Sequence, residues 1–118
     1  MRDGMRFRDN AEVALYERLK EKQRALPSTR TLLIIPNACV RVVDHTWEPD
    51  FIVVHEGRAG IIEVDGGSHR KKYASDKSRD KLLEDSGISR IDRIDAADAE
   101  NAVECRRFID DFLARLTR

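Results

Sequence analysis

The sequence predicts an α/β domain in which helices flank a mixed β-sheet. An amphipathic helical pattern opens the chain, runs of β-branched residues fill its middle, and helical patterns surround one further short run near its end. The order helix, strands, helix, strand, helix is typical of a sheet covered by helices. The 118 residues suit one domain over 1–118, because single domains usually contain about 100–150 residues.

The first helix is expected from about Asp9 to Leu26. Asp9 or Asn10 can cap it, apolar residues recur on one of its faces, and Pro27 ends it. Two short apolar runs, 32–35 and 39–43, then predict strands on either side of a bend at Pro36.

The strongest strand signal is a hairpin with strands at 51–55 and 60–64 and a turn at 56–59. A polar helix is expected from about Lys72 to Asp85. Gly87 is a suitable C-terminal stop for that helix.

A short strand is expected at 88–94, followed by a final helix that Asp98 caps. The apolar stripe of this last helix consists of Ala102, Cys105, Ile109, Phe112 and Leu116, with Val103, Phe108 and Leu113 beside it.

The charge balance excludes a histone-like or polycationic nucleic-acid-binding protein. Lys and Arg number 22, as do Asp and Glu, so the net charge is zero, although a local basic groove is not excluded. No apolar run approaches the roughly 18 residues of a membrane span, and no signal peptide is recognisable. Cys39 and Cys105 lack metal-ligand spacing and are expected to be reduced, buried thiols. These features predict a cytoplasmic protein.

Acidic residues gather where the hairpin strands begin and end. Asp50 precedes the first strand, while Glu63 and Asp65 end the second and share one face of it. With the turn centred between Gly57 and Arg58, Asp50 would lie opposite Asp65 and residue 52 opposite Glu63, so that three carboxylates converge. A slip of one residue would break this arrangement.

Three neighbouring carboxylates repel one another unless a cation lies among them. Oxygen ligands alone select a hard ion such as Mg²⁺ or Mn²⁺, which can activate water and bind a phosphate oxygen. The alternative is a strand end that is acidic and merely solvated.

The combination of Pro49-Asp50, a hairpin, Glu63-Val64-Asp65-Gly66-Gly67-Ser68-His69 and a basic helix resembles the PD-(D/E)XK nuclease superfamily. It is most similar to the very-short-patch-repair-like endonucleases, whose Asp-x-x-Arg-Asp motif is matched by Asp76-Lys77-Ser78-Arg79-Asp80. The similarity extends from the first helix to the strand at Ile91 and is specific between Pro49 and Asp80. It implies a restriction-endonuclease-like core and metal-dependent hydrolysis of phosphodiester bonds in DNA.

The resemblance also implies roles for individual residues. Asp50 and Glu63 would bind the metal, and Asp65 replaces the superfamily's usual lysine, which makes it a third ligand or a residue that positions water. His69 is a candidate general acid or base; the alternative is a surface loop residue. Glu12 would lie near the metal; the alternative is an acid that stabilises the first turn of its helix.

Charge is unevenly distributed along the chain. Residues 66–81 contain six basic and two acidic residues, a net charge of +4, whereas residues 92–112 contain seven acids and three arginines, a net charge of −4. Basic residues next to the acidic cluster can bind phosphates, although a charged helix face is often only a solvated one. The candidate nucleic-acid-binding residues are Arg70, Lys71, Lys72, Lys77 and Arg79.

Two rival functions remain open. One is a catalytically inactive nucleic-acid-binding or assembly module on the same fold, and the other is an unrelated α/β interaction domain whose acids cluster by chance. Because so small a domain covers little DNA, a homodimer or a larger protein partner is considered for the nuclease.

Overall fold

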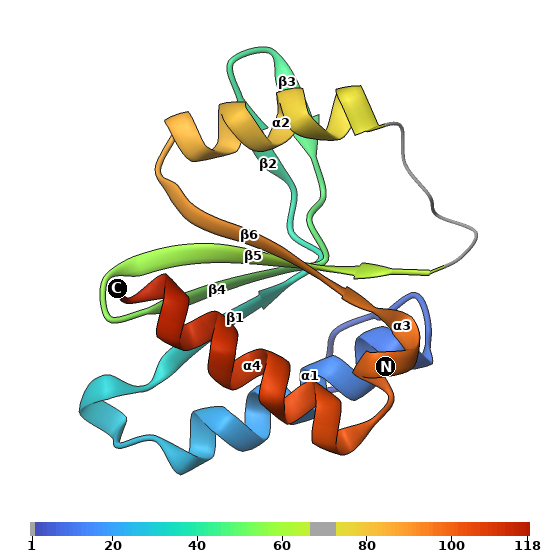
Figure 1. The fold of residues 1–118 in the computed structure, drawn as a ribbon, viewed down its shortest axis with the longest axis vertical. Helices are drawn as coiled ribbons and strands as arrows, with labels where there is room; N and C mark the ends of the chain where they lie inside the picture. The colour runs from blue at the N-terminus through green and yellow to red at the C-terminus, as the bar shows by residue number, and fades with distance from the viewer. Residues whose placement is uncertain (1, 67–72) are drawn as a thin grey trace.

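A mixed four-stranded sheet with the order β1-β4-β5-β6 forms the centre of the molecule (Figure 1). The computed structural model describes residues 2–66 and 73–118. Strands β1 (Leu32–Pro36), β4 (Phe51–His55) and β5 (Arg58–Asp65) pair antiparallel, whereas β6 (Ile88–Asp95) runs parallel to β5. The mixed sheet expected from the sequence is therefore confirmed.

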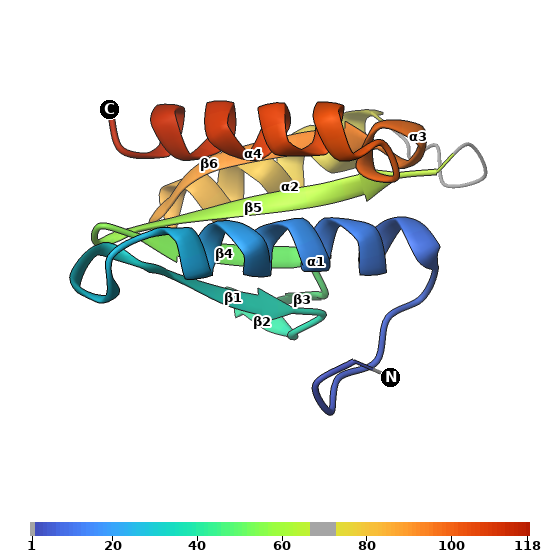
Figure 2. The same cartoon turned by 90° about the horizontal axis from the view of Figure 1, so that it is seen from below.

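Helices cover both faces of this sheet (Figure 2). Helices α1 (Asn10–Ala25) and α4 (Ala102–Leu116) lie side by side on one face, and α2 (Tyr73–Asp85) lies on the other. Helix α2 connects the parallel strands β5 and β6, in agreement with the need for a long crossover between parallel strands. The expectation of an α/β fold with a mixed sheet flanked by helices is correct.

The main core lies between the sheet and the pair α1 and α4. Asp9 caps α1 by accepting a hydrogen bond from the Glu12 N–H at 2.9 Å, as the sequence allowed. The apolar faces of the two helices are buried against Phe51, Val53 and Ile62 of the sheet. The buried apolar residues of the helices are Ala11, Leu15, Tyr16 and Leu19 of α1 and Cys105, Ile109, Phe112, Leu113 and Leu116 of α4.

The last helical region is divided, contrary to the single helix expected. Asp98 lies inside the short helix α3 (Ala96–Ala99), and Asn101 caps α4 by accepting a hydrogen bond from the Glu104 N–H at 3.1 Å. The predicted cap at Asp98 is wrong because the extended backbone of Asn101 interrupts the helix, and Asn caps as well as Asp. Val103, expected beside the apolar stripe, is exposed.

The β4–β5 hairpin is tighter than the sequence analysis assumed. Its turn consists of Glu56 and Gly57, both with positive φ, and His55 pairs directly with Arg58. Two-residue turns of this kind match the twist of the strands. Residue 52 therefore pairs with Ile61, not with Glu63, and because Phe51 pairs with Ile62, the expected placement of Asp50 opposite Asp65 is wrong as well. The pairing has shifted by two residues, which preserves the face on which each side chain lies.

A second, two-stranded sheet consists of β2 (Val40–Val42) and β3 (His45–Trp47). Strand β3 was not predicted, because it is only three residues long. In β3 the His45 ring stacks on Trp47 with 5.3 Å between ring centroids.

The two thiols lie in different environments. Cys39 is exposed, so the expectation that both cysteines are buried is wrong for it, because it precedes β2 outside the main core. Cys105 is buried, and burial raises the pKa of its thiol to about 11.

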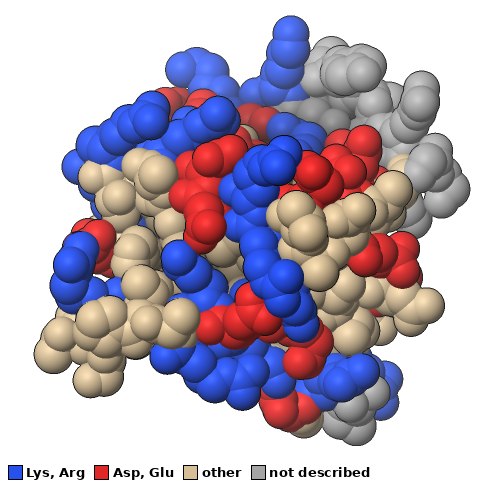
Figure 3. Space-filling model, turned by 60° about the horizontal axis from the view of Figure 1, so that its bottom comes forward, with Lys and Arg blue, Asp and Glu red and all other residues tan. Residues whose placement is uncertain are grey.

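Basic and acidic side chains are interleaved on the side of the molecule that carries α1 and α4 (Figure 3). Two ion pairs join these helices: Arg106 Nε lies 2.7 Å from Glu21 Oε1, and Lys22 Nζ lies 2.9 Å from Asp110 Oδ1. In the described part of the chain, no helix has both the length and the apolar character needed to cross a membrane.

Gly60 tests the packing of α4 on the sheet. A Cβ at position 60 would lie 2.6 Å from Phe112 Cζ and 3.0 Å from Leu116 Cδ1. Gly60→Ala should therefore lower the free energy of unfolding by about 1–3 kcal/mol, measured by denaturant titration. Combined with Phe112→Leu, which removes the closest ring atoms, Gly60→Ala should cost less than it does alone. Strictly additive effects would contradict this packing.

Candidate functional site

Two buried acids lie at the open end of the β4–β5 hairpin, away from its turn; this place is called the hairpin end below. Asp50, next to the start of β4, is 5% exposed, and Glu63 of β5 is 2% exposed. Asp and Glu are almost never buried this completely unless they are paired. The structure brings Asp50 and Glu63 to the same end of neighbouring strands, as the sequence analysis predicted, although through a different register.

Asp50 is fixed by contacts with both its carboxylate and its backbone. Its Oδ2 accepts a hydrogen bond from the Val64 N–H at 2.8 Å, so the side chain attaches to β5 one residue beyond Glu63. Its Oδ1 forms an ion pair with Arg8. The Asp50 carbonyl accepts a hydrogen bond from the Asn37 N–H at 3.0 Å. These contacts hold the carboxylate in place beyond the end of β4.

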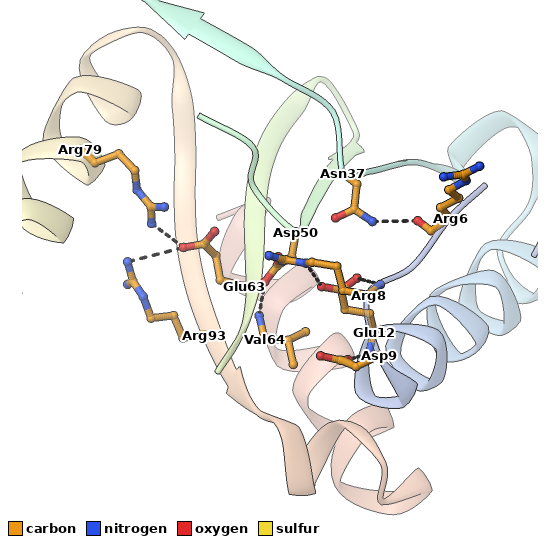
Figure 4. A network of polar contacts seen from close by, with 10 residues as sticks. All are labelled: Arg6, Arg8, Asp9, Glu12, Asn37, Asp50, Glu63, Val64, Arg79 and Arg93. Atoms are coloured by element: carbon orange, nitrogen blue, oxygen red, sulfur yellow. Dashed lines mark hydrogen bonds and ion pairs between the residues drawn. The ribbon is translucent and has the colours of Figure 1, made fainter. Parts of the chain in front are cut away.

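Arg8 links Asp50 to Glu12, another buried acid of the predicted set. The Arg8 Nε lies 2.8 Å from Glu12 Oε2, and the Arg8 backbone N–H donates to Glu12 Oε1 at 3.0 Å. Figure 4 shows the Arg8 side chain reaching from the start of α1 toward Asp50. Glu12 therefore lies in the same network as Asp50, through a shared guanidinium.

Glu63 faces α2 and β6, where two further arginines meet it (Figure 4). Its Oε1 forms an ion pair with Arg79 of α2 and lies 3.9 Å from Arg93 Nη2. Arg93 is the residue of β6 that pairs with Glu63. Asp80 contacts both arginines: its Oδ1 lies 3.2 Å from Arg79 Nη2, and its Oδ2 lies 3.0 Å from Arg93 Nη2. Burial alone would lower the pKa of Arg79, but its hydrogen bonds with Glu63 and Asp80 raise that pKa overall. Arg79 is therefore a permanent cation at this carboxylate.

Asp65, the third predicted ligand, lies at the end of β5, opposite Asp95 of β6. It is half-buried and lines a hollow of about 350 Å³ together with Arg93 and acidic residues of α3 and α4. Asp50, Glu12 and Glu63 are not among the residues that line this hollow.

The other predicted residues are placed only in part. His69, Arg70, Lys71 and Lys72 lie outside the described residues. Lys77 is exposed on α2, and Arg79, predicted to bind nucleic acid, contacts Glu63.

Sequence reasoning missed Arg8 and Arg93, which pair with these acids. Arg8 offered no helical signal, because it precedes the cap Asp9 and lies outside α1. Arg93 offered no local signal, because it meets Glu63 through the pairing of two strands separated by a helix.

The donor set at the hairpin end can be compared with the needs of a metal ion. Within residues 2–66 and 73–118, no group of three or more His, Cys, Asp or Glu side chains is arranged to hold one. Mg²⁺, however, usually binds through only one or two protein carboxylates, together with waters and substrate phosphates. A carboxylate has about four lone-pair sites, and Asp50 receives one donor at each oxygen. By this count Asp50 keeps lone-pair sites that a hard cation could use.

Comparisons of this sequence with protein-family models and with curated proteins find no match.

Arg8 should contribute to stability by neutralising two buried acids. Arg8→Met would leave Asp50 and Glu12 without this guanidinium, so the free energy of unfolding should fall by about 1–3 kcal/mol. Arg6→Met is the matched control, since Arg6 is an exposed arginine of the same segment and should change stability little. Equal losses in the two variants, measured by thermal and denaturant unfolding, would show that the ion pairs with Arg8 contribute nothing specific.

Proposed function

We propose that this protein is a metal-dependent endonuclease that hydrolyses phosphodiester bonds of DNA, on a restriction-endonuclease-like core. The observation that carries the proposal is the pair of buried carboxylates, Asp50 and Glu63, at one end of adjacent strands. Both occupy the motif positions whose resemblance to the very-short-patch-repair-like endonucleases implies metal ligands. The mixed sheet, with α1 covering one face, is compatible with that core.

In this proposal Asp50 and Glu63 hold one Mg²⁺ or Mn²⁺ ion. Such an ion supplies positive charge at the phosphate and lowers the pKa of the attacking water. The chain orients the two ligands: the Val64 N–H and Arg8 hold Asp50, while the pairing of β5 with β6 directs Glu63 toward Arg79 and Arg93. Glu12 is a positioning residue in this proposal, because Arg8 bridges it to Asp50.

The remaining predicted roles rest on the sequence. Asp65 as a third ligand, His69 as a general acid or base, and Arg70, Lys71, Lys72 and Lys77 as nucleic-acid contacts stay predictions. Lys77 has the exposure that such a contact requires.

A catalytically inactive nucleic-acid-binding or assembly module is the second candidate, and a specific observation favours it. Arginines already neutralise Asp50 and Glu63, so the fold needs no metal to compensate these buried charges. In such a module the acids would serve only to anchor the N-terminal segment, α2 and β6 to the hairpin.

Cleavage assays separate the two candidates. The protein is incubated with supercoiled plasmid, mismatched duplex and single-stranded DNA in Mg²⁺, Mn²⁺ or EDTA. Asp50→Asn and Glu63→Gln should each reduce the rate about 100-fold or more, the loss expected for a group that stabilises charge in the transition state. Asp92→Asn is the matched control, since Asp92 lies on β6 and pairs with Arg90. It should cleave like the wild type.

Folding of each variant is verified by circular dichroism and thermal unfolding. A folded wild type that cleaves none of these substrates in either metal would contradict the nuclease and favour the inactive module. Undiminished cleavage by Asp50→Asn and Glu63→Gln would contradict the proposed ligands.

A further inference from the structure

Two guanidinium groups converge beside Glu63, and one of their buried donors finds no acceptor in the part of the chain that the structure describes. All ion pairs of Arg79 and Arg93 within the described residues are made by their Nη2 atoms. The Nε atom of Arg79 is buried and has no hydrogen-bond partner among residues 2–66 and 73–118. A buried donor without an acceptor is unfavourable and needs an explanation.

The two arginines differ in their access to solvent. The Arg79 side chain is 11% exposed and comes from α2, whereas the Arg93 side chain is 31% exposed and comes from β6. A guanidinium carries five N–H donors in a planar fork that fits two oxygens of a phosphate. The pair therefore combines the partly exposed guanidinium of Arg93 with the buried Nε donor of Arg79, next to Glu63, one of the proposed metal ligands.

The charge of the ion-pair network at Asp50 and Glu63 would change on binding a metal. Within this network, four carboxylates (Glu12, Asp50, Glu63 and Asp80) are paired with three guanidiniums (Arg8, Arg79 and Arg93), which leaves one net negative charge. A divalent cation bound there would change this to one net positive charge. The cation would also compete with the arginines for Glu63, and their donors, which Asp80 contacts as well, would become available to another acceptor.

We propose that Arg79 and Arg93 form a phosphate-binding subsite that a divalent cation on Asp50 and Glu63 makes available. This inference rests on the proposed function and identifies the residues that hold the substrate's phosphodiester. Metal and phosphate then bind cooperatively, and by linkage each tightens the other by the same factor.

The experiment measures binding rather than cleavage. A fluorescein-labelled DNA duplex and its single strand are titrated with the protein in EDTA or in Ca²⁺ at constant ionic strength, and gels verify that the DNA stays intact. Calcium is a hard ion that carboxylate oxygens bind. Fluorescence anisotropy should show that Ca²⁺ tightens binding of the wild type to at least one of these probes by about tenfold.

Variants of Arg93 assign this effect. Arg93→Gln should lose most of the tightening by Ca²⁺, and Arg93→Lys should retain part of it, because lysine keeps the charge without the fork. Arg90→Gln is the matched control: Arg90 lies on the same strand, has a similar exposure of 33% and pairs with Asp92. It should behave like the wild type. Thermal unfolding verifies that each variant is folded.

The outcomes for the subsite and for the nuclease are distinguishable. Binding that depends on both Ca²⁺ and Arg93, in a protein that cleaves nothing, would support the subsite and remove the nuclease. Metal-dependent cleavage with DNA binding that is identical in wild type and Arg93→Gln would overturn the subsite and leave the nuclease. The subsite is equally overturned if Arg90→Gln and Arg93→Gln weaken binding alike, or if Ca²⁺ tightens binding of neither DNA form.

Discussion

The hairpin end depends on the neutralisation of buried carboxylates by arginines. Removing an ion from water costs several kcal/mol even after the protein relaxes, and breaking a buried pair leaves that cost uncompensated. Arg8 therefore ties the N-terminal segment to Asp50, and Arg79 and Arg93 tie α2 and β6 to Glu63. These ion pairs join three segments that are far apart in the sequence.

The same pairs shape any chemistry at this place. A metal at Asp50 and Glu63, as proposed, would enter a network already occupied by guanidiniums, so its binding would exchange partners rather than fill an empty site. Arginines released from the carboxylates would then be available to an anion. We thus propose that the carboxylates of these ion pairs also bind the metal and that their arginines also bind the phosphate.

Local patterns predicted most of the helices and strands. The features that they did not predict, the register of the hairpin and the contacts of Arg93, depend on pairing between distant strands or on turn length. The β-branched residues of the hairpin and the apolar stripe of α4 identified their elements, because each element buries one face. The turn centre expected between Gly57 and Arg58 lies one residue too late, because β-branched runs do not fix the length of a turn and only the observed pairing of His55 with Arg58 sets it. The proximity of Asp50 and Glu63 was predictable from their positions at the start and end of the hairpin strands. The contact of Arg93 with Glu63 was not, because it depends on the register of β5 with β6.

The most direct test of the account is a calorimetric titration of the protein with Mn²⁺, because it measures the ligands without requiring a known substrate. The wild type should bind one ion saturably. Asp50→Asn and Glu63→Gln should each weaken binding about tenfold or more, since even residues that only hydrogen-bond to a metal ligand change metal affinity about 10–100-fold. Equal affinity in the wild type and both variants, or no saturable binding by the wild type, would contradict a metal site at the hairpin end.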